Sequence, residues 1–138
     1  MIILDASMAL AWIFERDNKK EAICADHVLQ KMESMETIVP PLWHSEISNA
    51  LLVGERRKVV TEAQVIDYLN RLSHLPLTTD TASPANIRGL ILSLAREYNL
   101  TAYDATYLEL ALRTKSTLAT FDNKLAIAMK KAGGEIFH

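Results

Sequence analysis

The chain begins with a short aliphatic run, Ile2-Ile3-Leu4, that ends at a carboxylate, Asp5. An aliphatic run this short, with no polar alternation, is typical of a buried strand of a parallel sheet, because helices cover both faces of such a sheet. Ligands of open α/β sheets bind at the carboxyl edge of the strands, where Asp5 leaves this one. The segment therefore predicts an α/β fold and raises the question of whether other acidic residues reach the same edge.

Strand-like and helix-like segments alternate along the rest of the chain. Strands are expected over residues 2–4, 37–39, 75–78, 117–121 and 135–137. Apolar periodicity and capping signals predict helices over residues 8–14, 21–34, 42–57, 61–73, 83–98, 101–113 and 125–131. Pro76 places its strand at a sheet edge, because proline cannot donate to a central ladder. This order predicts an α/β fold class, a three-layer α/β/α sandwich with a mostly parallel sheet of four to five strands.

Bulk properties predict a single domain over residues 1–138 and favour no particular partner. A net charge of -2 is unlike the strongly basic balance of many nucleic-acid-binding proteins. Cys24 is the only cysteine, which excludes an internal disulfide and suits a reducing, cytoplasmic environment. The apolar residues before Asp5 are too few for a signal peptide, and no stretch approaches the roughly 20 apolar residues of a membrane span.

Two further carboxylates fall on helix faces that are otherwise apolar. On a helical wheel of residues 42–57, Glu46 lies beside Asn49 within the face that carries Trp43 and Ile47. In the helix of residues 101–113, Asp104 lies at the centre of the apolar face, whereas Glu109 and Arg113 are expected to form an exposed i,i+4 pair. A carboxylate on a buried face is costly unless it is paired, hydrogen-bonded or bound to a metal.

Each acid also has a structural explanation. Asp5 and Asp122 follow strands and precede helices, so either can cap a helix, and Asp104 stands three residues after Thr101 as in a capping box. Glu46 lies in an early helical turn, where a carboxylate can interact favourably with the helix dipole. Together the four acids indicate a cation-binding site, because carboxylates that converge without a cation repel one another and some must protonate. Mg²⁺ or Mn²⁺ resolves that conflict through oxygen ligands, and such a site suits metal-assisted phosphodiester hydrolysis. No histidine or cysteine spacing offers a zinc alternative.

Four segments in register resemble the PIN-domain ribonucleases, and most of all the VapC-type toxins of toxin–antitoxin pairs. The segments are Ile3-Leu4-Asp5-Ala6-Ser7, Glu46-Ile47-Ser48-Asn49-Ala50-Leu51, Leu100-Thr101-Ala102-Tyr103-Asp104-Ala105 and Ala119-Thr120-Phe121-Asp122. The resemblance covers essentially the whole chain. It implies an Mg²⁺- or Mn²⁺-dependent endoribonuclease, usually a homodimer, that an antitoxin protein holds inactive by blocking the acidic pocket.

By position, the resemblance implies that Asp5, Glu46, Asp104 and Asp122 are the catalytic and metal-binding acids. Ser7 and Thr120 match hydroxyl residues that support the metal shell, and Asn49 is a further supporting candidate. The substrate is then RNA, and some basic side chains must contact its phosphates. The sequence does not choose among these basic residues, which are Arg56, Arg57, Lys58, Lys124, Lys130 and Lys131.

Other functions fit less well. A haloacid-dehalogenase-like enzyme needs a second aspartate where Ser7 stands, and a receiver domain needs an acidic pair near the first strand, where Asp5 is alone. A housekeeping PIN nuclease in RNA processing and a non-catalytic PIN module that grips RNA or protein remain as alternatives.

Overall fold

Four short strands form a parallel sheet at the centre of the computed structural model, which describes residues 1–138. The strands are β1 (Ile2–Leu4), β2 (Thr37–Val39), β3 (Leu77–Thr79) and β4 (Thr117–Ala119). Their spatial order is β3-β2-β1-β4, and every neighbouring pair is parallel. The predicted parallel sheet is thus confirmed, with the proline-flanked strand β3 at an edge.

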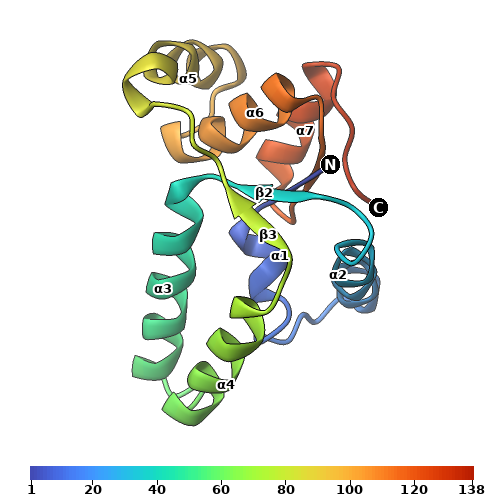
Figure 1. Ribbon diagram of the computed structural model, residues 1–138, viewed down its shortest axis with the longest axis vertical. Helices are drawn as coiled ribbons and strands as arrows, with labels where there is room; N and C mark the ends of the chain where they lie inside the picture. The colour runs from blue at the N-terminus through green and yellow to red at the C-terminus, as the bar shows by residue number, and fades with distance from the viewer.

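Seven helices cover the two faces of the sheet. They are α1 (Ala6–Leu10), α2 (Lys19–Lys31), α3 (Pro41–Arg56), α4 (Glu62–Ser73), α5 (Pro84–Tyr98), α6 (Ala102–Thr114) and α7 (Asn123–Lys131). Figure 1 shows α5, α6 and α7 grouped above the strands and α1 to α4 below them. This arrangement is the predicted three-layer α/β/α sandwich. None of the helices is both long and apolar enough to cross a bilayer.

The core is built around β1 and α6. All three residues of β1 are fully buried, as expected for a central parallel strand, and so are Tyr107 and Leu108 of α6. Burying one large aliphatic side chain contributes about 1.5–3 kcal/mol, so this contact between the central strand and α6 is a major source of stability. It also holds α6 firmly against the sheet.

Local signals explain where several helices begin and end. Thr61 and Gln64 form a reciprocal capping box at the start of α4, and the Thr101 hydroxyl accepts the backbone N–H of Asp104 at the start of α6. Pro41 and Pro84 occupy first helical positions, which tolerate proline. Gly133 has a φ of 86°, as expected for a glycine that follows the end of a helix.

Several details of the predicted elements are wrong. The first helix begins at Ala6 and stops at Leu10 instead of running from 8 to 14. The segment 135–137 contributes a single bridge between Leu118 and Ile136, not a fifth strand. In the predicted helix of residues 61–73, apolar spacing predicts an inward face of Val65, Ile66, Leu69 and Leu72. Ile66 is instead 53 % exposed and Leu69 44 % exposed, because the core face of α4 is centred on Val65 and Tyr68.

The prediction for Glu109 is also wrong. Its side chain is buried at 1 % exposure instead of lying on the surface, although it does pair with Arg113. Helical spacing correctly predicted the pair, but not that Glu109 would be buried close to α5 and the start of α3. Arg113 in turn reaches Asp80, the residue after β3, through two guanidinium hydrogen bonds of 3.2 and 2.6 Å.

Candidate active site at the carboxyl edge of the sheet

Asp5 and Asp122 leave two neighbouring strands at the same edge of the sheet. Strand β1 pairs with β4 so that Leu4 lies opposite Ala119, and the Asp5 backbone N–H donates to the Ala119 carbonyl at 3.0 Å. Asp5 directly follows β1, and Asp122 follows β4 as the N-cap of α7. The expectation that both acids reach one edge is therefore met by the strand register.

The Asp5 carboxylate is buried, at 6 % exposure, and is held by two hydroxyls. Ser7 donates to Asp5 Oδ2 at 2.7 Å and Thr120 donates to the same oxygen at 2.6 Å. Backbone N–H groups of Phe121 and Asp122 donate in turn to the Ser7 and Thr120 hydroxyl oxygens. This fixes both hydroxyl orientations and leaves Oδ1 free of side-chain hydrogen bonds.

The surroundings of Asp5 disfavour its charged form. Burial raises the pKa of the Asp5 carboxyl above its ordinary value, the Thr120 and Ser7 hydrogen bonds oppose that rise, and the Asp122 charge adds to it. The hydroxyls therefore only partly replace the water that Asp5 has lost. An additional positive charge near Oδ1 would further stabilise the charged form of Asp5.

Glu46 enters from α3 and is anchored by a tyrosine that sequence reasoning missed. The buried Tyr107 hydroxyl of α6 donates to Glu46 Oε1 at 2.5 Å. Burial raises the pKa of Glu46, the Tyr107 bond opposes the rise, and the charges of Asp5 and Asp104 add to it. The spacing of Tyr107 three residues after Asp104 was an available signal, because it places both residues on one helix face.

Asp104 lies in the first turn of α6, half-buried. Its pKa is raised, mainly by burial and then by the charges of Asp122 and Asp5, whereas the Lys124 ammonium lowers it. Its backbone N–H makes the Thr101 capping bond, so the capping explanation is correct for the backbone. A side-chain hydrogen bond with Thr101 also lowers the pKa of Asp104, so the capping residue and the other acids act on the same carboxyl.

Asp122 both caps a helix and interacts with the other acids. Its Oδ1 accepts the backbone N–H of Leu125 at 2.9 Å, so it does cap α7. Its charge also acts on Asp5 and on Asp104. Helix capping and membership of the acidic cluster are therefore compatible for this residue.

Electrostatic repulsion links the four acids, and no cation balances them within ion-pair distance. Each acid acts on at least one other, and none takes part in any ion pair of the protein. No three acidic, histidine or cysteine side chains lie close enough to one another to form a ready-made metal site. Charge interactions reach further than coordination bonds, so the acids lie within range of mutual repulsion but are not arranged around one coordination position.

The donor chemistry of this cluster fits a hard divalent cation. All four side chains offer carboxylate oxygens, which Mg²⁺ and Mn²⁺ prefer, and Asp5 Oδ1 is unclaimed by either hydroxyl. Asn49, the other supporting candidate, is exposed on α3 and makes none of the hydrogen bonds that hold the acids. Ser7 and Thr120 therefore have structural contacts that match a supporting role, and Asn49 does not.

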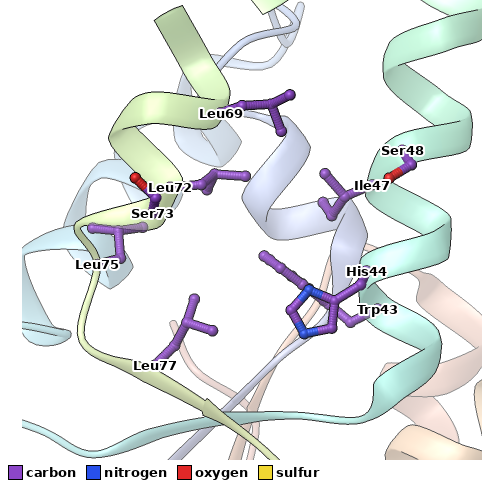
Figure 2. Close-up of a pocket in the computed structure, with 9 residues that line it drawn as sticks. All are labelled: Trp43, His44, Ile47, Ser48, Leu69, Leu72, Ser73, Leu75 and Leu77. Atoms are coloured by element: carbon purple, nitrogen blue, oxygen red, sulfur yellow. The ribbon is translucent and has the colours of Figure 1, made fainter. Parts of the chain in front are cut away.

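A separate hollow of about 320 Å³ lies between α3, α4 and the segment entering β3 (Figure 2). Figure 2 shows leucines from α4 and β3 facing Ile47 and the ring of His44 across it. His44 Nε2 is 2.9 Å from the Thr79 hydroxyl, and no acidic residue lines the hollow. It therefore lacks the carboxylates that a divalent-metal site would need.

Comparison with known proteins agrees with this geometry. The PIN domain family model matches residues 2–131. Ribonuclease VapC3 of Pyrobaculum aerophilum is 26% identical over 125 residues, covering 91% of this chain and 92% of the relative. The crystal structure of PAE2754 from Pyrobaculum aerophilum superimposes with a TM-score of 0.70 at 26% identity, over 98% of this chain and 81% of that one. The crystal structure of FitAcB from Neisseria gonorrhoeae shares the fold, with a TM-score of 0.66 at 17% identity. The match covers 100% of this chain and 97% of that one. With a family match over nearly the whole chain and the acids at the carboxyl edge of its sheet, the protein belongs to the PIN domain family.

Proposed function

We propose that the protein is a metal-dependent endoribonuclease and the toxin of a toxin–antitoxin pair. The observation that carries the proposal is the group of four carboxylates, Asp5, Glu46, Asp104 and Asp122, which repel one another with no cation paired to them. Such a group is stabilised by a divalent cation. The similarity to a protein named Ribonuclease VapC3 supports RNA as the substrate.

The residues have distinct roles in this proposal. The four acids bind Mg²⁺ or Mn²⁺, which when present supplies an activated water and stabilises charge that develops on the phosphate. Ser7 and Thr120 hold Asp5 Oδ2, so that Oδ1 presents its lone pairs in a fixed direction. Tyr107 holds Glu46 Oε1 in the same way from the opposite helix. These hydrogen bonds fix ligand orientation before the substrate arrives.

The proposed partners follow from the same family membership. They are a cognate antitoxin protein that blocks the acidic pocket and a second copy of the chain in a homodimer, in the cytoplasm. A housekeeping nuclease of RNA processing is the second candidate, because the acidic site alone fits both. Induced expression separates the two, since a toxin arrests growth and a small neighbouring gene relieves the arrest, whereas an active but harmless nuclease indicates the housekeeping role.

Metal titration with two readouts tests the activity. We expect cleavage of single-stranded RNA in Mg²⁺ or Mn²⁺ and none in excess chelator. We also expect either metal to raise the melting temperature of the wild type, because it binds the native state. A melting temperature that does not respond to millimolar metal would reject the metal site. Metal binding without cleavage of any RNA would instead indicate the non-catalytic module.

A further inference from the structure

A groove of about 480 Å³ lies between the end of α5 and the exposed face of α7. Tyr98 and Asn99 line it from α5, and Lys124, Ile127 and Lys131 line it from α7. These three α7 residues recur at intervals of three and four, so they form one stripe along the helix. The groove therefore presents two cations separated by an apolar side chain.

Both lysines of the groove are exposed and without an ion-pair partner. The ion pairs of the protein involve Arg16, Arg71 and Arg113, and none involves a lysine. Glu97 is the only acidic residue that lines the groove, so its walls carry an excess of positive charge. A local excess of this kind is notable in a protein whose net charge is -2.

The groove begins beside the acidic cluster and leads away from it. Lys124 stands two residues after Asp122, in the first turn of α7, and its ammonium acts on the carboxyl of Asp104. Lys131 ends the same helix seven residues later, roughly 10 Å further along at about 1.5 Å per residue. A strand of RNA whose scissile phosphate lies at the acids would have its next phosphates within reach of these two lysines.

We propose that this groove binds the backbone of single-stranded RNA on one side of the cleaved bond. Lys124 and Lys131 contact consecutive phosphate segments, and a base lies against the half-buried ring of Tyr98 and the exposed side chain of Ile127. The inference rests on the proposed nuclease function and adds to it the surface that holds the substrate. It separates these two lysines from the other basic residues of the chain.

The test is the salt dependence of RNA binding by a double variant, Lys124→Gln/Lys131→Gln. Binding is measured in chelator, with a labelled single-stranded RNA that the wild type cleaves in metal. Each lost phosphate contact lowers the slope of log affinity against log salt by about 0.7, so the double variant should lose about 1.4 of the wild-type slope. We expect an increase in KM of about tenfold or more in cleavage assays, with kcat changed much less, because the acids remain in place.

Lys130→Gln is the matched control. Lys130 is exposed on the same helix but does not line the groove, and its replacement changes net charge by the same amount as either single variant. We expect its slope to equal that of the wild type. Equal slopes for the wild type and the double variant, or equal losses per lysine in the double variant and the control, would overturn the proposal.

Failure of the groove and failure of the nuclease function give different results. If the wild type cleaves RNA in metal and the double variant binds it with an unchanged salt slope, the groove proposal alone is wrong. If the wild type neither binds nor cleaves single-stranded RNA, the proposed function is wrong and the groove proposal falls with it. Melting temperatures of all the variants check folding, which the substitution of exposed lysines should leave intact.

Discussion

Two clusters of acidic side chains include residues of helix α6, but a cation balances the negative charge in only one of them. In the first, which comprises Asp5, Glu46, Asp104 and Asp122, burial together with mutual repulsion raises the pKa of the first three. In the second, Glu109 is almost fully buried and Asp80 is mostly buried, yet Arg113 bonds both, and the pKa of Asp80 is lowered. The second cluster contains its own cation, whereas no cation is paired with the first.

The difference separates a structural network from a candidate catalytic one. A salt bridge that is complete within the protein stabilises packing and has little capacity to bind a ligand. Carboxylates held by neutral hydroxyls from Ser7, Thr120 and Tyr107 stay available to an external cation. Such unbalanced and perturbed groups are characteristic of functional sites.

The largest effect is expected from Asp5→Asn. The amide keeps the shape of the side chain but removes the charge at the centre of the first cluster, so we expect RNA cleavage to fall at least about a thousandfold, or about 4 kcal/mol. Without metal, its melting temperature should match or exceed that of the wild type, because a repulsive charge is gone. Asp80→Asn, the corresponding change in the second cluster, should lower the melting temperature and preserve cleavage. Retained cleavage in Asp5→Asn would reject its assignment.

Arg113→Met should produce the largest loss of stability. It leaves Glu109 buried without a partner, which costs about 3–5 kcal/mol for a fully buried pair. We expect about 2–3 kcal/mol in urea denaturation here, because the Arg113 side chain is 35% exposed and water screens part of the interaction. The double variant Arg113→Met/Glu109→Gln should recover part of that loss, since it also removes the buried charge. Equal stability of the single and double variants would contradict this account of Glu109.

Tyr107→Phe should weaken metal binding by about tenfold, a typical cost for removing a group that orients a metal ligand. The midpoint of the Mn²⁺-dependent rise in melting temperature measures it directly. Tyr68→Phe is the matched control, because its buried hydroxyl also donates a hydrogen bond, but to the backbone carbonyl of Ala9 and not to a carboxylate. If both variants shift the metal midpoint equally, Tyr107 contributes only packing.

The smallest effect is the pH dependence of the metal-free protein. The raised pKa values of Asp5, Glu46 and Asp104 mean that the folded state binds more protons than the unfolded state at pH values above about 4, so stability falls as pH rises through them. Lowering the pH from 7 toward 5 should therefore raise the melting temperature. Asp5→Asn should show a smaller rise than the wild type, and saturating Mg²⁺ should reduce it further. Asp80 has the opposite effect on stability, because its pKa is lowered in the folded state. The stability that its charged form provides is lost only as the pH falls below about 4.

Much of the fold was predictable because its signals are local. The aliphatic run before Asp5, the proline positions at the starts of α3 and α5, and the caps at Thr61 and Thr101 each act over a few residues. The inward positions of Glu46 and Asp104 followed from helical periodicity alone. Periodicity failed for Glu109 and Ile66, because exposure depends on which neighbouring helix packs against a face and how far along it.

The sequence by itself determined the fold class, the parallel central strand and the four acids that approach one edge, because strand polarity and helical spacing dictate these. Only the tertiary structure decided which neutral groups hold each acid, since Tyr107 and Glu46 are 61 residues apart and Thr120 and Asp5 are 115 apart. It also decided that Arg113 neutralises the second cluster while no cation is paired with the first. Coulomb energy depends on distances in space, and those distances exist only once β1, β4, α3 and α6 have packed together.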